Sequence, residues 1–414
     1  MNTLKKLSDI NFSNYDAVIV GAGFAGTVIA ERLSNKYGFK VLVLEKRSHV
    51  GGNAYDEYDE NGFLIQKYGP HIFFTDLVEV LDYVSNFCNL VQHDVVMLSY
   101  FDGKYVQLPF NFKSVEQMMG YRKARKVIDG IKNAYPCSKR ISIFDLMNDP
   151  NDDVSEFGNL LYKKAFETYI CKQWGLKPEQ ISKDVINRCK FSPNYTNRYL
   201  DRDFHFLPDK GFTVLMENML TNDHIDVCLN YDANEHIKIH DNKIFIDGKE
   251  FSNTLVYTGP IDELFSYKYG KLPYRSMYFV TEYFDEERKL AEEIVSMPQD
   301  PKVIRKTEYK YFSPFIIKER EAKTVVVSEE PYQYDYKPDS IMCYPVINDT
   351  NIGLFEKYNF DAKKVNNLVM CGRLAEYKYF NMDMIISNSL KMSDEVAIKI
   401  KGNKWYERNY FSWW

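Results

Sequence analysis

The sequence predicts an α/β fold in which one parallel-sheet domain is built from three separate parts of the chain. Residues 16–60 read as strand, turn, helix, strand and loop. A similar pattern returns from about residue 212, with a helix in GFTVLMENML and short strands in KIFIDG and TLVYTG, and again near residue 367 as strand, loop and long helix. Between these parts lie a helix-rich stretch over 113–184 and a stretch over 275–345 whose alternation is typical of antiparallel strands.

Length and composition fit a globular protein of several domains. The chain has 414 residues, enough for two or three domains with sizeable cores. Apolar residues make up 45% and charged residues 27%, which is ordinary for such a protein. We expect the parallel-sheet domain to comprise residues 1–90, 212–265 and 346–414 (the last with an aromatic C-terminal tail), a mostly helical domain to comprise 91–185, and an antiparallel sheet domain to comprise 186–211 and 266–345.

Charge and hydropathy exclude several classes of function. The net charge of -5 argues against a nucleic-acid or anionic-membrane surface, which needs a basic excess. No run approaches 18 apolar residues, and the N-terminus lacks an apolar signal-peptide core, so we expect a cytoplasmic protein. The seven cysteines form no CxxC pair and the seven histidines no HExxH or HxH spacing, so we expect no metal.

A glycine motif near the N-terminus predicts a dinucleotide site. The apolar strand AVIV is followed by Gly21, Gly23 and Gly26 in GxGxxG spacing, and a helix follows. These glycines allow a tight turn, close approach of a pyrophosphate and packing of the helix on the strand. The next apolar strand ends at Glu45, 24 residues after Gly21, where an acid can accept the ribose hydroxyls. The alternative is a plain βαβ unit whose glycines serve only packing.

The residues after Glu45 favour FAD over a nicotinamide cofactor. The stretch KRSHVGGNAY supplies a basic residue, Arg47, and a second glycine pair, which resembles the FAD fingerprint of the amine-oxidase and mutase flavoproteins. The late block MCGRLAEYKYFNMD precedes a helix, whose N-terminus can stabilise negative charge on a reduced flavin. The candidate cofactor-binding residues are Gly21, Gly23, Phe24, Gly26, Glu45, Lys46, Arg47, Gly51, Gly52, Asn53, Gly372, Arg373 and Met382.

Seven stretches together resemble the bacterial flavin-dependent UDP-galactopyranose mutases. They are EKRSHVGGNAY, YGPHIFFT, LPFN, YICKQWG, YTGPID, YPV and GRLAEYKYFNMD, in the order expected for that family, and KQWG and GRLAEYKY are the most specific. The resemblance covers residues 15 to about 400. It implies an FAD-binding Rossmann-like domain with two insertions, a helical bundle that carries a mobile loop and a twisted antiparallel β-sheet.

The resemblance also implies a reaction. These enzymes interconvert the pyranose and furanose forms of a nucleotide sugar with no net redox change. The reduced flavin is thought to act as a nucleophile and to form an adduct between its N5 and the sugar. We therefore expect a UDP- or dTDP-hexose as substrate, an external reductant such as NAD(P)H, a homo-oligomer and a role in surface polysaccharide synthesis.

By resemblance, the side chains that act on the substrate are spread along the chain. Arg188 falls 14 residues after Trp174, where the family has an arginine that binds the diphosphate, and Arg305 matches the second such arginine. The remaining matches are His71 beside the flavin, Tyr199, Tyr344 and Tyr379 around the phosphates, and Phe166, Tyr169 and Trp174 at the nucleobase. Each of these residues could instead have only a structural role. The arginines could be solvated, the tyrosines could serve packing, the nucleobase residues could belong to a helix core and the histidine could be structural.

The sugar end departs from the family pattern. Phe74 replaces a second histidine, Val95–Met97 stand where NSP is usual, and Asn381 replaces an acidic residue. Apolar side chains cannot pair with a sugar hydroxyl, so we expect a less hydroxylated sugar, such as a 6-deoxy hexose. Backbone groups or waters could instead take over those contacts, or the alignment could slip near Val95.

Two other functions compete with a mutase. An FAD oxidoreductase of the amine-oxidase type shares the N-terminal fingerprint but does not need Arg188, Arg305 or the KQWG block. A silent nucleotide-sugar binding protein would have lost one of the two arginines, and both are present. A nucleotide-sugar mutase is therefore the leading interpretation.

Overall fold

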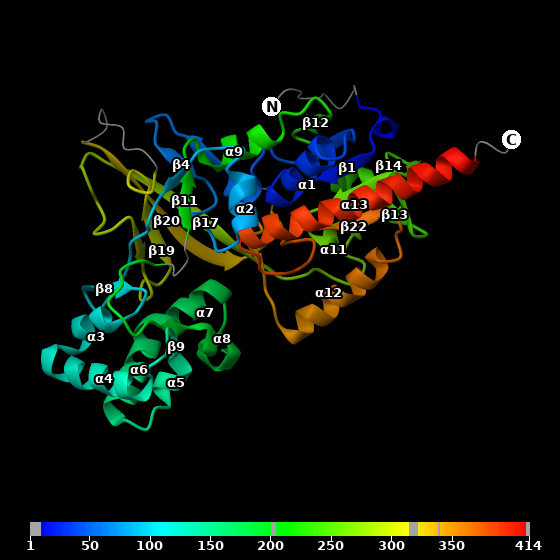
Figure 1. The fold of residues 1–414 in the computed structure, drawn as a ribbon. Helices are drawn as coiled ribbons and strands as arrows, with labels where there is room; N and C mark the ends of the chain where they lie inside the picture. Colours follow the sequence, from blue (N-terminus) through cyan, green and yellow to red (C-terminus); the bar gives the residue numbers. More distant parts are fainter. Residues whose placement is uncertain (1–9, 182, 200–203, 314–321, 338–339, 411–414) are drawn as a thin grey trace.

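A larger body and a smaller helical lobe make up the fold (Figure 1). The computed structural model describes residues 10–410 except 182, 200–203, 314–321 and 338–339, with no side chains described at 184, 188 and 403–410. Both main sheets lie in the body, and the helical lobe, coloured cyan to green, projects from it. Within the described residues, no helix combines the length and the apolar character needed to cross a bilayer.

The body contains the predicted parallel sheet, which is built from three parts of the chain. Its strand order is β12-β2-β1-β16-β22, and every neighbouring pair is parallel. Strands β1 and β2 read AVIV and VLVL, and all but Val20 are at most 1% exposed, as expected for strands covered on both faces. The predicted α/β fold is therefore confirmed. The strands are β1 (Ala17–Val20), β2 (Val41–Leu44), β12 (Ile225–Cys228), β16 (Thr254–Tyr257) and β22 (Leu368–Met370).

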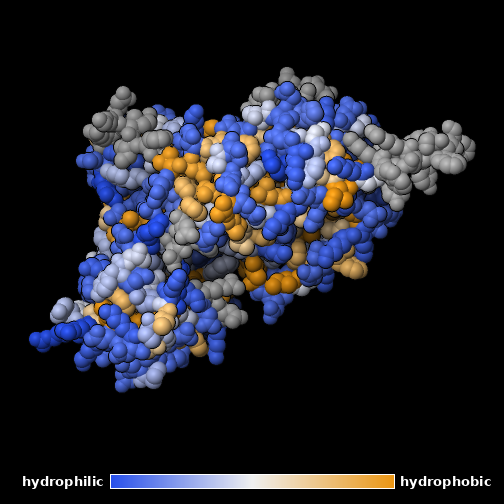
Figure 2. All heavy atoms as spheres, viewed as in Figure 1, coloured by the Kyte–Doolittle hydropathy of each residue, from blue (hydrophilic) through white to orange (hydrophobic). Residues whose placement is uncertain are grey.

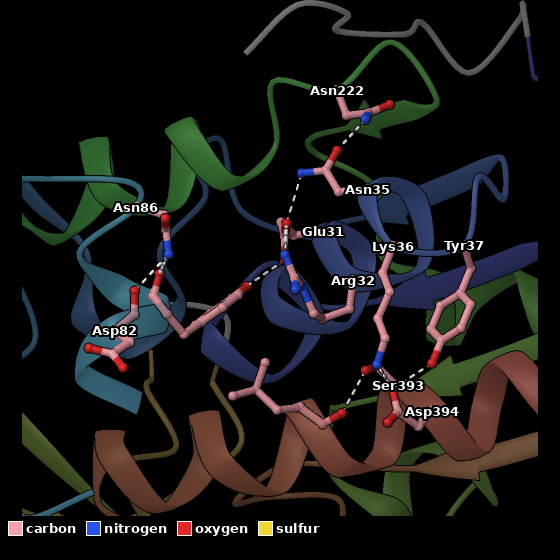
Figure 3. Close-up of polar contacts among 12 residues, drawn as sticks. Glu31, Arg32, Asn35, Lys36, Tyr37, Asp82, Asn86, Asn222, Ser393 and Asp394 are labelled. Carbon is pink, nitrogen blue, oxygen red and sulfur yellow. Dashed lines mark hydrogen bonds and ion pairs between the residues drawn. The ribbon is translucent and has the colours of Figure 1, made fainter. Parts of the chain in front are cut away.

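Helix α1 (Phe24–Asn35) and the C-terminal helix α13 (Met382–Tyr410) pack side by side on this sheet (Figure 1). A polar network fixes α1 to its neighbours (Figure 3). The Glu31 carboxylate is 0% exposed and accepts hydrogen bonds from Arg32 and from the Tyr83 hydroxyl, the latter at 2.8 Å. On the outer side, Lys36 Nζ lies 2.8 Å from Asp394 Oδ1 on α13. The first and last parts of the chain are thus held together by charged groups.

The second large sheet has seven strands in the order β21-β17-β20-β19-β18-β7-β8. All neighbouring pairs are antiparallel except β18 and β7. Strands β7 and β8 come from residues that the sequence analysis assigned to the mostly helical domain. These residues form strands instead, because the side chains of MLSYF and KYVQL alternate between more and less buried positions. The bounds are β7 (Met97–Phe101), β8 (Lys104–Leu108), β17 (Tyr274–Phe284), β18 (Ile294–Ser296), β19 (Arg305–Glu308), β20 (Thr324–Gln333) and β21 (Tyr344–Pro345).

The helical lobe is formed by residues 112–191. Asn111 and Asn151 cap α3 and α6 by accepting hydrogen bonds from the backbone of the first turns. Between α6 and α7 the chain passes through a π-helical turn, a form that is frequent at functional sites. The elements are α3 (Phe112–Met119), α4 (Tyr121–Ala134), β9 (Ile141–Ser142), α5 (Ile143–Met147), α6 (Asp152–Leu161), the π-turn Tyr162–Glu167, α7 (Thr168–Trp174), α8 (Lys183–Arg188) and β10 (Lys190–Phe191).

Small sheets and short helices complete the body. Strand β11 lies in the stretch 186–211, which the sequence assigned to the large antiparallel sheet, but it pairs with β5 and β6. The small-sheet strands are β3 (Asp56–Tyr58), β4 (Leu64–Gln66), β5 (Phe73–Thr75), β6 (Leu90–Gln92), β11 (Phe204–Pro208), β13 (Ile237–His240), β14 (Lys243–Ile246) and β15 (Lys249–Phe251). The remaining helices are α2 (Val78–Val84), α9 (Gly211–Met219), α10 (Ala233–His236), α11 (Ile261–Leu264) and α12 (Asp349–Ala362), with 3₁₀ turns at Phe12–Asn14, Gly52–Ala54 and Pro178–Gln180.

The Tyr83 hydroxyl bond to Glu31 gives a test of the fold. Tyr83→Phe removes one donor from a fully buried carboxylate, and a hydrogen bond to a charged group contributes about 1.5–3 kcal/mol. We expect the free energy of unfolding, measured by urea denaturation, to fall by that amount. Tyr121→Phe is the control, because Tyr121 is 79% exposed. Equal urea midpoints for the two variants would show that the Glu31 bond contributes nothing.

Candidate active site

Two glycine turns meet at the carboxyl end of β1. Gly21 has a φ of +100°, and a Cβ on it would lie 2.1 Å from the Thr258 hydroxyl. Gly52 has a φ of +55°, and its Cβ would lie 2.8 Å from Gly23 Cα, while a Cβ on Gly26 would lie 2.0 Å from the Gly21 carbonyl oxygen. Helix α1 begins here with no side-chain cap and no acidic residue in its first turn. Its free N–H groups can therefore receive a phosphate.

Glu45 and Arg47 brace these turns. The Glu45 carboxylate accepts hydrogen bonds from the Ala22 amide at 2.8 Å and from the Arg47 amide at 2.9 Å. The Arg47 guanidinium donates to the Gly52 carbonyl at 2.9 Å and to Asn53 Oδ1 at 3.1 Å. The structure thus brings these predicted cofactor residues together around one cradle.

Three other predicted cofactor residues contribute differently. Gly51 has a φ of +110° and donates its amide to the Ala22 carbonyl at 2.9 Å, which joins the two turns. The Phe24 ring is buried and packs edge-on against Phe212 at 6.2 Å, so its side chain serves the core. The Lys46 side chain is exposed.

The last part of the chain reaches the same region through Arg373. Gly372 has a φ of +118°, and its amide donates to Glu376 at 3.0 Å. Arg373 donates to the Cys343 carbonyl at 3.1 Å and lies 5.1 Å from the Tyr379 ring centroid. A backbone turn alone therefore does not explain Arg373, because its guanidinium also bonds the residue just before β21.

The residues just before α13 shape the start of that helix. The Asn381 carbonyl accepts a hydrogen bond from the Ile385 amide at 3.0 Å, and Met382 is the first helical residue. Asn381 and Met382 are both half-buried. The helix N-terminus predicted for the flavin end is therefore present.

Arg305 occupies the middle of the large sheet opposite Glu329. The two residues pair across β19 and β20, and the guanidinium donates two parallel hydrogen bonds of 2.6 Å to the carboxylate. Burial lowers the pKa of Arg305, but the charge and hydrogen bonds of Glu329 more than offset it, so the pKa lies above its ordinary value. Glu329 is 2% exposed and Arg305 is 26% exposed, so the pair presents its cationic side to the site.

His71 lies near this cation and is held neutral. Burial lowers the pKa of His71 to about 4, and the charges of Arg373 and Arg305 act in the same direction. Nδ1 lies 2.7 Å from the Gly69 carbonyl oxygen, which can only accept, so Nδ1 carries the hydrogen. Nε2 is therefore an acceptor at neutral pH.

Tyrosines surround Arg305. Burial raises the pKa of Tyr169 and of Tyr199 above the ordinary value, while the charge of Arg305 acts in the opposite direction on both. The charge of Tyr379 acts on the same two hydroxyls. The structure thus places two of the predicted residues, Tyr169 and Tyr199, within electrostatic range of the Arg305 guanidinium, and Tyr379 within range of both hydroxyls.

The end of α7 presents Trp174 to β21. The Trp174 ring meets the Tyr344 ring edge-on, with centroids 5.3 Å apart, and the Tyr344 hydroxyl donates to the Gln173 carbonyl at 3.3 Å. Phe166, in the π-turn, packs edge-on against Phe110 at 5.2 Å, so part of its ring serves the lobe's core. Figure 2 shows the surface hollowed between the helical lobe and the body.

Arg188 lies on α8, and the apolar residues expected at the sugar end lie on and beside β5 and β7. Arg188 ends α8, and its side chain lies outside the described part of the structure. Val95 and Met97 are 3% and 4% exposed and belong to the hydrophobic core. Their side chains therefore do not form an apolar lining for a sugar, and only Phe74 and Val96 remain partly exposed.

Three residues of the site were missed in the sequence. Glu329 is the partner of Arg305, and its only signal is a charge inside the apolar strand TVVVSEEP. Arg275 and Lys172 hold the end of α7, and Lys172 lies in the KQWG block without a role assigned to it. Among the described residues, no group of three or more His, Cys, Asp or Glu side chains is placed so that it could hold a metal ion.

Comparisons with known proteins agree with this geometry. The sequence profile of the UDP-galactopyranose mutase family matches residues 164–379, and that of an NAD(P)-binding Rossmann-like domain matches residues 19–87. The UDP-galactopyranose mutase of Mycoplasma genitalium is 33% identical over 400 residues, covering 94% of this chain and 96% of its own. The dTDP-fucopyranose mutase of Escherichia coli is 30% identical over 397 residues, covering 94% and 99%.

A solved structure shows the same fold. A crystal structure of reduced UDP-galactopyranose mutase superposes with a TM-score of 0.66 at 15% identity and covers 94% of this chain and 96% of that one. The resemblance seen in the sequence is thus confirmed over nearly the full length. The chain is an isomerase and belongs to the UDP-galactopyranose mutase family.

Proposed function

We propose that this enzyme interconverts the pyranose and furanose forms of a nucleotide hexose for surface polysaccharide synthesis. The observation that carries the proposal is the Arg305 guanidinium, which two hydrogen bonds to Glu329 hold in place and which lies within electrostatic range of two tyrosines and of a neutral His71. Such a group can bind a diphosphate as negative charge grows on it. The substrate would be UDP-galactose or a close relative, such as a 6-deoxy or N-acetyl sugar nucleotide.

The residues present fit FAD as the cofactor. The cradle leaves no room for a Cβ on Gly52, which would meet Gly23 Cα, and the uncapped start of α1 suits a pyrophosphate. The Glu45 carboxylate would accept the ribose hydroxyls. When bound and reduced, the flavin would supply the nucleophile that takes the sugar from its nucleotide, and NAD(P)H would supply the electrons.

The chain itself would bind and orient the substrate. Trp174, Tyr169 and Phe166 would hold the nucleobase, and Arg188, Tyr199, Tyr344 and Tyr379 would complete the phosphate site around Arg305. Glu329 occupies Nε and Nη2 of Arg305, and within the described residues Nη1 has no hydrogen-bond partner, so it can turn to an oxygen of the diphosphate. In either direction of the proposed reaction, the nucleotide is detached from the sugar and later rejoined to it. The residues that bind the nucleobase and the diphosphate would therefore have to hold the nucleotide while the sugar is detached.

The direct test of the proposed function is an assay of turnover. The purified protein is incubated with UDP-galactose, with and without dithionite, and the products are separated by chromatography. Furanose formed only by the reduced protein supports the proposal. Flavin reduction by an amine or alcohol, with no furanose, would select the oxidoreductase of the amine-oxidase type.

Gly52→Ala tests the cofactor cradle. A Cβ at this position meets Gly23 Cα, so we expect the purified variant to lose nearly all bound flavin, measured as flavin absorbance per chain. Gly103→Ala is the matched control, because Gly103 also has a positive φ of +72° but nothing lies within 4 Å of its Cβ. If Gly103→Ala loses as much flavin, backbone strain rather than contact between the turns explains the result.

Two arginine variants test the diphosphate site. We expect Arg305→Lys and Arg188→Ala to lose about 10²–10³-fold in turnover of the reduced enzyme while flavin content is unchanged. Lysine at 305 keeps a positive charge beside Glu329, so the sheet is not left with an unpaired buried carboxylate. It cannot, however, donate the two parallel hydrogen bonds of a guanidinium. Arg288→Lys is the control, since Arg288 lies in an exposed pair with Glu292. Near-normal turnover in either test variant would remove that residue from the mechanism.

Phe74→His tests the sugar end. A ring nitrogen can pair with a sugar hydroxyl, and such a bond contributes about 0.5–1.5 kcal/mol, or roughly 2- to 12-fold in rate. We expect the variant to shift the ratio of kcat/KM for UDP-galactose to that for dTDP-fucose towards UDP-galactose by that factor. Phe360→His, on an exposed face, should leave the ratio unchanged. An unchanged ratio in Phe74→His would show that this position does not read the sugar.

A further inference from the structure

Lys172 makes an unusual set of contacts near the C-terminal end of α7. Its ammonium donates to the Met297 carbonyl at 2.6 Å, to the Val303 carbonyl at 2.8 Å and to the Asp300 carbonyl. All three hydrogens are thereby used on one backbone turn, which joins β18 to β19. Burial lowers the pKa of Lys172 to about 8, with Asp300 acting in the opposite direction, so the group is still largely charged at neutral pH.

Arg275 holds the same helix end from the other side. This residue of β17 is 4% exposed and donates to the Lys172 carbonyl at 2.9 Å and to the Gln173 carbonyl at 2.8 Å. It thus pairs two of the carbonyls that a helix leaves unbonded at its C-terminus. Gly175 closes the helix in the left-handed conformation, and a Cβ on it would lie 2.6 Å from the Arg275 guanidinium.

Lys172 and the turn that it contacts are each close in sequence to a residue expected to bind the substrate. Lys172 is two residues before Trp174, and Val303 is two residues before Arg305. The turn from 297 to 303 has its own anchor to the sheet, because the Ile304 amide donates to the Glu329 carbonyl at 2.9 Å. A shift of α7 along its axis would therefore pull on the strand that carries Arg305.

We propose that Lys172 is a positioning residue that sets the distance between Trp174 on the helical lobe and Arg305 on the sheet, and so makes nucleobase and diphosphate binding depend on each other. The inference rests on the proposed function, in which both residues contact one nucleotide. Arg275 fixes the helix end to β17, and among the hydrogen bonds of the described residues those of Lys172 alone join it to the turn before β19. A purely structural lysine would support the fold without affecting nucleotide affinity.

The test compares three variants of the flavin-loaded enzyme by calorimetric titration with UDP. Lys172→Met keeps the apolar stem and removes the ammonium, so we expect the Kd for UDP to rise at least fivefold, with kcat/KM falling mainly through KM. Lys172→Arg restores a cation and should lie within threefold of the wild type. Lys302→Met is the matched control, because Lys302 is an exposed cation in the same turn, and its Kd should not change.

The outcomes separate this inference from the proposed function. If the wild type binds neither UDP nor dTDP in this titration, the proposed function fails before the variants are compared, and if it binds only dTDP the variants are compared with dTDP. If the wild type binds and a folded, flavin-loaded Lys172→Met has a Kd less than fivefold higher, the positioning role is wrong. Should Lys172→Met not fold, hydrogen exchange of the wild type decides: the amides of 300 and 302–304 should exchange more slowly at saturating UDP, and unchanged exchange there would overturn the inference.

Discussion

The site depends on one cross-strand ion pair, Arg305 with Glu329. Register places the two side chains directly opposite each other on β19 and β20, and a slip of one strand by one residue would leave them on opposite faces of the sheet. A carboxylate that is 2% exposed cannot be left without a cation, so the fold itself fixes the orientation of the guanidinium. The cation is thus set before any ligand arrives, which is the arrangement that electrostatic stabilisation of a leaving group requires.

Much of the architecture could be predicted from the sequence because it depends on local patterns. The strand AVIV, the glycine spacing and Glu45 indicate the parallel sheet and the cradle, and the structure has both. Domain limits were harder to read. Strands β7 and β8 precede a helical stretch in the chain yet join a sheet formed mostly by residues far downstream, and no local signal reports that pairing.

The site was predictable where motifs carry it and not where long-range contacts do. Arg305, His71 and Tyr169 were named from matched positions, and the structure gathers them near one another. Glu329 and Arg275 were not, since their partners come from strands and helices distant in sequence. The apolar sugar lining stays a prediction at Phe74 and Val96, whereas the side chains of Val95 and Met97 pack in the hydrophobic core.

The three-part construction of the parallel sheet has a consequence for synthesis on the ribosome. Strand β1 emerges early, but its neighbour β16 follows more than 200 residues later, and the edge strand β22 with helix α13 comes last. Lys36, which pairs with Asp394, and the face of α1 that packs on α13 therefore wait for partners while two complete insertions are made. Such late pairing is slow and leaves apolar surface exposed. Nascent chains stalled before residue 368 should be clients of chaperones rather than flavoproteins.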